Sequence, residues 1–193
     1  KIKGYSKQER SKIMTTVEPI RNKKDVEKVE RYLQKQSARD HLIFVFGTNS
    51  GLRISDIVAL NVGDVRNKNY VQIIEKKTGK TKRFPLNDKL KTLIADFVKG
   101  KRDKEPLFKS LWGRRYNRIT AYYMIREACK NVGLEEKIGT HSMRKTFGYH
   151  HYQQFKDVAL LQKIFNHSSQ QITLRYIGIE QDQIDYSYNN FVL

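Results

Sequence analysis

The sequence predicts a mainly α-helical fold with one small antiparallel β-hairpin inserted among the helices, an α+β arrangement. Most of the chain repeats apolar residues three or four positions apart, which is the spacing of one helix face. Residues 70–75 differ, because they are rich in Val and Ile and precede the turn dipeptide Thr78-Gly79. No internal repeat or low-complexity tract interrupts this pattern.

The chain before the hairpin predicts an N-terminal arm followed by three helices. Residues 1–21 are basic, contain Pro19 and show little periodicity, so we expect an arm or linker that is too short to be a domain. Asn22 is a good N-cap for the first helix, and Gly51 should end the second. The expected bounds of the helices are 23–36, 40–48 and 54–60.

The hairpin should have strands at residues 70–75 and 82–86, with the turn between them. Pro85 has no backbone N–H to donate to a neighbouring strand. The second strand should therefore lie at the edge or the end of the sheet.

Five helices are expected after the hairpin. Asn87 should cap the first and Thr140 the third, while Gly133 and Gly178 should stop the second and the last. Residues 179–193 mix acidic, amide and aromatic side chains with little core, so we expect a tail there, after a single domain at 22–178. The expected helices are about 87–99, 117–132, 140–152, 157–165 and 169–176.

Net charge is the strongest global property of the chain. Its 193 residues include 38 Lys and Arg against 20 Asp and Glu, a formal charge of +18. Such an excess suits a polyanion, since Lys and Arg displace counterions from a phosphate backbone. A solubilising surface is the alternative, so charge alone favours nucleic acid without deciding it.

Cysteine usage and hydropathy indicate the compartment. Cys129 is the only cysteine, which excludes an internal disulfide and fits an intracellular, cytoplasmic location. The longest apolar run, residues 42–46, is far too short to span a membrane, and no secretory signal is visible. Because the chain starts at Lys1, we expect a processed product or a part of something longer.

His141 and Arg144 are the first candidates for chemistry. They are three positions apart and share one helix face, and the first turn of a helix has free amide groups that favour an anion. The pair suits a phosphate group. Taken alone, the pair is better explained as two neighbouring surface residues. The rest of the sequence therefore decides whether the pair belongs to a phosphate site.

Three motifs in a fixed order supply that context, and together they resemble the tyrosine recombinase (phage integrase) family. The resemblance runs from about residue 22 to residue 176 and implies the mainly helical catalytic domain of that family. Any one motif is common, but all of them in order are hard to explain by chance. The motifs are Gly51-Leu52-Arg53 with Asp56, His141-Ser142-Met143-Arg144, and Asn166-His167-Ser168-Ser169 with Thr173 and Tyr176.

The resemblance implies that the protein cuts and rejoins a DNA phosphodiester bond. Tyr176 would be the nucleophile and would form a phosphotyrosyl bond to the 3′ end of the cut strand. Arg53 and Arg144 would clamp the non-bridging oxygens, because planar guanidinium groups donate paired hydrogen bonds. His141 would accept the tyrosine proton and return it in the reverse step. His167 would hydrogen-bond a non-bridging oxygen or support the transition state.

The leaving 5′ oxygen needs a proton donor, for which the resemblance implies Lys77 at the hairpin tip. Lys76, Lys80 and Lys82 stay open as alternatives. Asp56 would orient a catalytic residue from behind the site.

No metal ion and no cofactor are expected, because the energy of the broken bond is kept in the phosphotyrosyl link. Gly79-Lys80-Thr81 mimics the end of a P-loop, but the first glycine of that motif is missing. No group of Asp and Glu suits two metal ions, and His150-His151 would point apart on a helix.

We therefore expect a site-specific recombinase or integrase that acts on double-stranded DNA, as a homotetramer on two sites and as a monomer when free. A type IB topoisomerase-like enzyme and a non-catalytic DNA-binding regulator on the same fold are the alternatives. Lys145 stands where the family often has a second histidine, and Phe165-Asn166 where Leu-Gly is usual. No counterpart of the family's N-terminal DNA-binding domain precedes residue 22, so we expect an excised catalytic domain or a short natural recombinase.

In the family, the segment after the nucleophile often packs into a neighbouring subunit. Ile179, Ile184 and residues 191–193 give the tail of this chain apolar anchors. We expect the tail to dock in trans on assembled DNA, or in cis in the free monomer.

Overall fold

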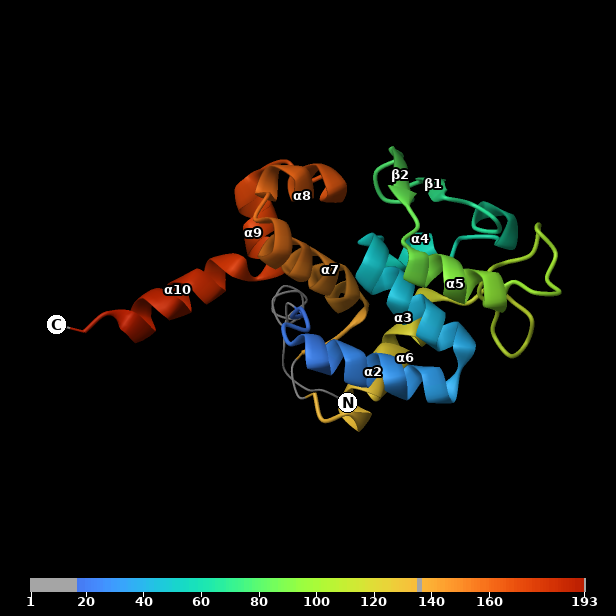
Figure 1. The fold of residues 1–193 in the computed structure, drawn as a ribbon, viewed down its shortest axis with the longest axis horizontal. Coiled ribbons are helices and arrows are strands. Elements are labelled where there is room, and N and C mark those ends of the chain that lie inside the picture. The colour runs from blue at the N-terminus through green and yellow to red at the C-terminus, as the bar shows by residue number, and fades with distance from the viewer. Residues whose placement is uncertain (1–16, 135–136, 193) are drawn as a thin grey trace, which may run out of the picture.

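A helix that is buried on every side, α3 (Ala38–Ser50), forms the centre of the fold. Residues 41–47 are all buried, because apolar side chains point from this helix in every direction and need partners all round. The helices α2 (Lys23–Gln36), α5 (Asp88–Phe97) and α7 (Thr140–Phe155) contact it. The computed structural model describes residues 17–134 and 137–192, and Figure 1 shows how its elements are arranged.

The helices around α3 begin close to where the sequence predicts. Asn22 and Asn87 cap α2 and α5, because their side chains accept backbone N–H groups of the first helical turn. Asn117 does the same for α6 (Arg118–Asn131). α3 is longer than the expected 40–48, since the Ser37 hydroxyl accepts the N–H of Asp40 and caps the helix earlier.

The expected hairpin forms a two-stranded antiparallel sheet. β1 (Tyr70–Ile74) pairs with β2 (Thr81–Pro85), in a register that runs from Tyr70 opposite Pro85 to Ile74 opposite Thr81. Phe84 fixes the hairpin to the core, with its ring centroid 6.4 Å from that of Phe46 in α3. Pro85 ends β2, as its missing N–H predicts.

The third expected helix is shorter than predicted. α4 covers Ile54–Ile57 rather than 54–60, and a 3-10 turn, η1, follows at Val62–Asp64. Arg115 accounts for the early end, because its guanidinium donates to the three consecutive carbonyls of residues 58–60 at 3.1, 2.6 and 3.0 Å. These carbonyls are satisfied by a side chain instead of by further helical turns.

The C-terminal third of the chain forms a second, smaller core. α7 is followed by α8 (Val158–Phe165) and α9 (Gln170–Ile177). Leu161, Phe165 and Ile177 are fully buried between these helices. This part of the chain carries most of the predicted catalytic residues.

The prediction that Thr140 caps α7 is wrong. The N-cap is Gly139, whose N–H donates to the Ser142 hydroxyl at 3.1 Å. Thr140 is therefore the first residue of the helix. The mistake moves the start of α7 by one residue and leaves His141 in the first turn.

The tail is a helix, α10 (Ile179–Asn190), which its composition did not predict. Figure 1 shows it projecting from the body of the molecule. Arg21 ties its first turn to the N-terminal end of the described chain, with ion pairs to Asp182 and to Glu18 at 3.1 Å each. The same guanidinium lies 5.7 Å from the ring centroid of Tyr149 in α7.

Residues 17–21 of the predicted arm lie against the body of the fold. Ile20 is buried, and its N–H donates to the Thr146 hydroxyl of α7 at 2.8 Å. Residues 1–16 lie outside the described residues, so the arm and the domain boundaries remain predictions. Within the described chain, no helix combines the length and the apolarity that crossing a membrane requires.

Candidate active site

Arg144 connects parts of the candidate site that are far apart in the sequence. Its side chain is 2% exposed, and its guanidinium donates to the carbonyl of Gly51, after α3, and to that of Phe165, at the end of α8. Carbonyls at a helix C-terminus lack helical partners and carry partial negative charge, so they suit a buried guanidinium. The loop after α3 is thereby held against the end of α8.

Arg53 lies in this loop, in extended backbone just before α4. Its Nη1 is 3.0 Å from Oε1 of Glu75, a carboxylate with no exposed surface. Thr78 and Asn166 donate to the other oxygen of Glu75 at 2.8 and 3.2 Å. Burial would raise the pKa of Glu75, but these hydrogen bonds and the charge of Arg53 hold that pKa below its usual range.

Asp56 holds the hairpin beside Arg53. It is 3% exposed and accepts the N–H of Lys76 at 3.1 Å. Its second oxygen has no hydrogen-bond partner in the described part of the chain. The contact fixes the backbone next to Lys77, and the orienting role of Asp56 stays a prediction.

Lys82 differs from the other three candidate lysines of the hairpin, which are exposed. Lys82 is 8% exposed, and its ammonium has no hydrogen-bond partner among residues 17–134 and 137–192. Burial, and then the charge of Arg144, lower the pKa of Lys82 to about 8. The alternation of side chains along β2 could have identified this residue, because Lys82 and the buried Phe84 share one face of the strand.

His141 lies in the first turn of α7 with part of its ring exposed. Burial lowers the pKa of His141, and the positive charges of Arg144, Arg53, Lys77 and Lys145 lower it further. The ring is therefore neutral at neutral pH and available to accept a proton. Lys77 at the hairpin tip is thus one of the charges that act on the start of α7.

His167 follows α8, and its orientation is fixed by Thr173. Nδ1 of His167 lies 3.1 Å from the Thr173 hydroxyl, which donates its own proton to the Ser169 carbonyl at 3.1 Å. The hydroxyl therefore accepts Nδ1–H, and Nε2 is the nitrogen that carries the lone pair. Burial, and then the charges of Arg144 and Arg53, lower the pKa of His167 to about 4.

Tyr176 lies on α9 with its ring against His167. The two ring centroids are 5.1 Å apart at an interplanar angle of 75°, and the Phe165 ring lies 5.6 Å from Tyr176. Burial raises the pKa of Tyr176, while the charges of Arg144 and Arg53 oppose this shift. Its hydroxyl therefore needs a base to become a nucleophile.

Lys145, which stands where the family often has a second histidine, is a further cation beside Tyr176. It is 5% exposed, and its Nζ lies 5.3 Å from the ring centroid of Tyr176. Burial lowers the pKa of Lys145, an effect that the charge of Glu18 opposes. No pattern in the sequence indicates this burial, because lysine at a helix surface is normally solvated.

The fold thus brings the predicted site residues into one region. Arg144, His167 and Tyr176 all lie against the Phe165 ring, and Arg144 holds the loop that carries Arg53. The charge of Lys77 acts on His141. The catalytic roles remain predictions. No group of three or more His, Cys, Asp or Glu that could hold a metal ion is present in the described residues.

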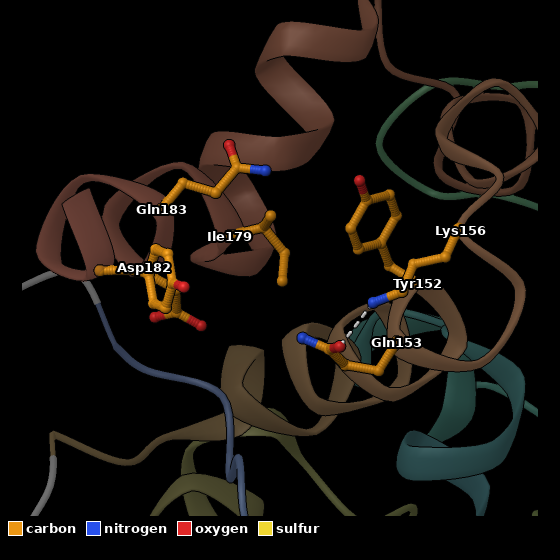
Figure 2. Close-up of a pocket in the computed structure, with 7 residues that line it drawn as sticks. Tyr152, Gln153, Lys156, Ile179, Asp182 and Gln183 are labelled. Carbon is orange, nitrogen blue, oxygen red and sulfur yellow. Dashed lines mark hydrogen bonds between the residues drawn. The ribbon is translucent and has the colours of Figure 1, made fainter. Parts of the chain in front are cut away.

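A pocket of about 280 Å³ lies elsewhere, between the end of α7 and α10 (Figure 2). Tyr152 and Lys156 line it from α7, and Ile179 and Tyr186 line it from α10. No predicted catalytic residue contributes to its walls, so it is not the place of the proposed chemistry.

Comparison with known proteins identifies the chain. Residues 11–182 match the model of the phage integrase family. The chain belongs to the phage integrase family. This family member is 48% identical over 179 residues to the probable integrase/recombinase YoeC of Bacillus subtilis (strain 168), an alignment that covers 92% of the chain and 98% of YoeC.

Solved structures confirm the predicted fold of this integrase-family chain. It resembles a crystal structure of XerA recombinase with a TM-score of 0.73 and 17% identity, over 93% of the chain and 66% of XerA. It also resembles a lambda integrase tetramer bound to a Holliday junction, with a TM-score of 0.67 and 16% identity, over 83% of the chain and 48% of that protein. The fold is that of a tyrosine recombinase catalytic domain, and the chain spans about half to two thirds of these longer proteins.

Proposed function

We propose that this protein is a site-specific DNA recombinase that cuts and rejoins DNA through a 3′-phosphotyrosyl intermediate. The observation that carries the proposal is the double hydrogen bond of Arg144, which joins the loop of Arg53 to the helix end before His167. His167 and Tyr176 pack their rings against Phe165 at the same place. A phosphate group bound there meets two guanidinium groups and the nucleophile together.

In the proposed reaction, the oxygen of Tyr176 attacks phosphorus as the bond from phosphorus to the 5′ oxygen breaks. His141 accepts the phenol proton, and a hairpin lysine gives a proton to the leaving oxygen. Arg53 and Arg144 stabilise the charge that spreads over the non-bridging oxygens, and the loss of one such donor costs about 10²–10³ in rate. Rejoining reverses these steps when a new 5′ hydroxyl attacks the phosphotyrosyl bond, so neither ATP nor a metal ion is required.

Lys77 is the lysine that we propose as the proton donor, because its charge acts on His141 across the site. Lys82 is the alternative. It is buried near Arg144 and Arg53, and an ammonium with a pKa of about 8 releases its proton more readily than an ordinary lysine.

The proposed substrate is double-stranded DNA, which fits the net charge of +18. We propose a homotetramer on two DNA sites and a monomer in the absence of DNA. The lambda integrase tetramer on a Holliday junction, which is similar in fold, is consistent with such an assembly. The cytoplasm of a bacterial or phage-host cell is the compartment in which that DNA is found.

α10 is the segment that we propose to join one protomer to the next. Ile184 in the middle of α10 is 44% exposed, and Phe191 and Val192, which follow the helix, are 69% and 88% exposed. Exposed apolar side chains along a projecting segment fit an acceptor surface on another copy of the chain.

A covalent adduct with DNA tests the proposal. A pool of nicked half-site duplexes with randomised arms can be used without knowing the target site. After the cut, the short strand diffuses away, which prevents rejoining and traps the covalent intermediate. We expect a denaturant-resistant protein–DNA adduct that is lost in Tyr176→Phe. Tyr186→Phe and Tyr188→Phe are the matched controls, because both tyrosines are exposed on α10. An adduct that survives in Tyr176→Phe would refute the nucleophile.

The adduct assay and an assay of the products formed from a supercoiled plasmid together separate the alternatives. A non-catalytic regulator would bind DNA in a salt-sensitive manner without forming any adduct. A topoisomerase-like enzyme would form the adduct but convert a supercoiled plasmid into topoisomers, whereas a recombinase yields recombinant junctions between selected sites.

A further inference from the structure

Glu75 contacts three of the segments that bring predicted catalytic residues into the site, although it belongs to none of the three motifs. It follows β1 at the base of the hairpin turn and has no exposed surface. Arg53 pairs with one of its oxygens at 3.0 Å. Thr78, next to Lys77, and Asn166, next to His167, donate to the other at 2.8 and 3.2 Å.

The backbone of Glu75 is held as firmly as its side chain. Its N–H donates to the Lys80 carbonyl at 3.0 Å, and its own carbonyl accepts the N–H of Gly79 at 2.8 Å. These two bonds close the hairpin turn around the residue. A carboxylate whose main chain and side chain are both fixed gives its partners little freedom to move.

Asn166 makes the contact with Glu75 from a strained position. Its φ of 53° lies in the left-handed region, where glycine is favoured and asparagine is the most tolerated side chain. Glycine at this position would adopt the same backbone conformation but would have no side chain to donate a hydrogen bond to Glu75. The asparagine amide therefore adds a link between the hairpin and the segment that leads into His167.

Burial of a carboxylate is costly unless it is paired and hydrogen-bonded. Glu75 pairs with Arg53 and accepts hydrogen bonds from Thr78 and Asn166, which come from the loop before α4, the hairpin turn and the end of α8. A displacement of any one of the three segments removes a partner from the buried charge. The three segments are consequently coupled through one side chain.

We propose that Glu75 is a positioning residue for DNA strand cleavage, holding Arg53, the hairpin tip and the His167 segment in their reactive arrangement. The role rests on the proposed recombinase function. Glu75 touches no DNA in this scheme. It pairs with Nη1 of Arg53, and the guanidinium has five N–H donors, so donors remain for a phosphate oxygen.

The opposite role makes a distinct prediction. If Glu75 instead competed with DNA for Arg53, its neutralisation would release the arginine and speed cleavage. The positioning role requires slower cleavage, because a shift of about 1 Å in a catalytic group costs on the order of 10²-fold in rate.

The test compares Glu75→Gln, Glu75→Asp and Asn166→Gly with the parent protein. Glu127→Gln is the matched control, since Glu127 is exposed on α6 and the substitution is the same. Each protein is given saturating nicked half-site DNA, and three quantities are measured. These are the single-turnover rate of adduct formation, the DNA concentration at half-saturation and the melting temperature.

Glu75→Gln should cleave on the order of 10²-fold more slowly than the parent at saturating DNA. It should bind DNA at least as tightly, because it carries one more net positive charge. Glu75→Asp should recover part of the rate by restoring the charge. Asn166→Gly should fold normally, because glycine adopts the left-handed backbone of this position. It should still lose some cleavage rate, though less than Glu75→Gln, because the hydrogen bond to Glu75 is removed.

Parental rates in Glu75→Gln or Asn166→Gly, or faster cleavage in Glu75→Gln, would overturn the positioning role. The positioning role would also be overturned if Glu75→Gln lost DNA affinity and melting temperature together with cleavage rate. Such a result would mean that Glu75 only stabilises the fold. A parent protein that forms no adduct would instead refute the recombinase proposal. The two failures are therefore distinguishable.

Discussion

The guanidinium of Arg144 donates a hydrogen bond to the carbonyl of Gly51, 93 positions earlier in the chain. A second N–H reaches the carbonyl of Phe165, 21 positions later, at 2.9 Å. One side chain therefore spans the two halves of the candidate site. Arg144 has a structural task in addition to its predicted contact with phosphate.

Arg144→Lys should reduce both cleavage and stability. Lysine keeps the charge but cannot reach two carbonyls with a planar fork, and each buried carbonyl left unpaired costs about 1–3 kcal/mol. We expect adduct formation to fall by about 10²–10³ and the urea midpoint of unfolding to fall with it. Arg53→Lys is the comparison, since lysine can retain the ion pair with Glu75, and it should lose cleavage with a smaller loss of stability. Equal losses of stability in the two variants would contradict the bridging role of Arg144.

The choice between Lys77 and Lys82 can be made with a sulfur atom in place of the leaving 5′ oxygen. A thiol has a pKa near 8.5 and leaves without being protonated, so only the variant that lacks the proton donor is rescued. Lys77→Ala should cleave normal DNA about 10²–10⁴ times more slowly and recover on the sulfur-containing substrate. Lys82→Ala should not recover. Rescue of Lys82→Ala alone would transfer the role to the buried lysine.

The low pKa of His167 predicts a loss of stability in acid. Its pKa is about 4 in the folded protein, against a reference value of 6.5. As the pH falls from 6.5 towards 4, the unfolded chain binds the proton first, so this contribution is present above pH 6.5 and is lost progressively below it. Urea unfolding across this range should be less pH-dependent in His167→Gln than in the parent protein. Parallel curves for the two proteins would contradict the shift.

Deletion of residues 180–193 should separate cleavage from assembly. Ile179 is the buried residue of α10, and the truncated chain retains it, so the site on α9 should stay folded. We expect adduct formation on a half-site at close to the parental rate, and loss of the complex that pairs two full sites in a gel-shift assay. Unchanged assembly and unchanged control of cleavage in the truncated protein would refute the role of the tail.

Local signals account for the parts of the fold that could be predicted. Asn22, Asn87 and Asn117 cap helices because their side chains accept N–H groups nearby in the chain, and this chemistry is visible in a few consecutive residues. The end of α4 could not be predicted, because it depends on Arg115, which is more than fifty positions away.

The same distinction holds within the candidate site. The order of the motifs predicted that His167 and Tyr176 belong together, and their rings are in contact. Glu75, beside Lys76 and Lys77 in the sequence, has the pattern of a solvated hairpin charge. Glu75 is a buried carboxylate with three partners only because of tertiary packing. A local sequence pattern cannot predict packing of this kind.

Arg21 lies just where the described chain enters the body of the fold, and Asp182 where it leaves in α10. This ion pair thus connects the first described residues with the start of the C-terminal helix. Loss of this ion pair would free the start of α10 from Arg21, while Ile20 would stay bound to α7 through the Thr146 hydroxyl.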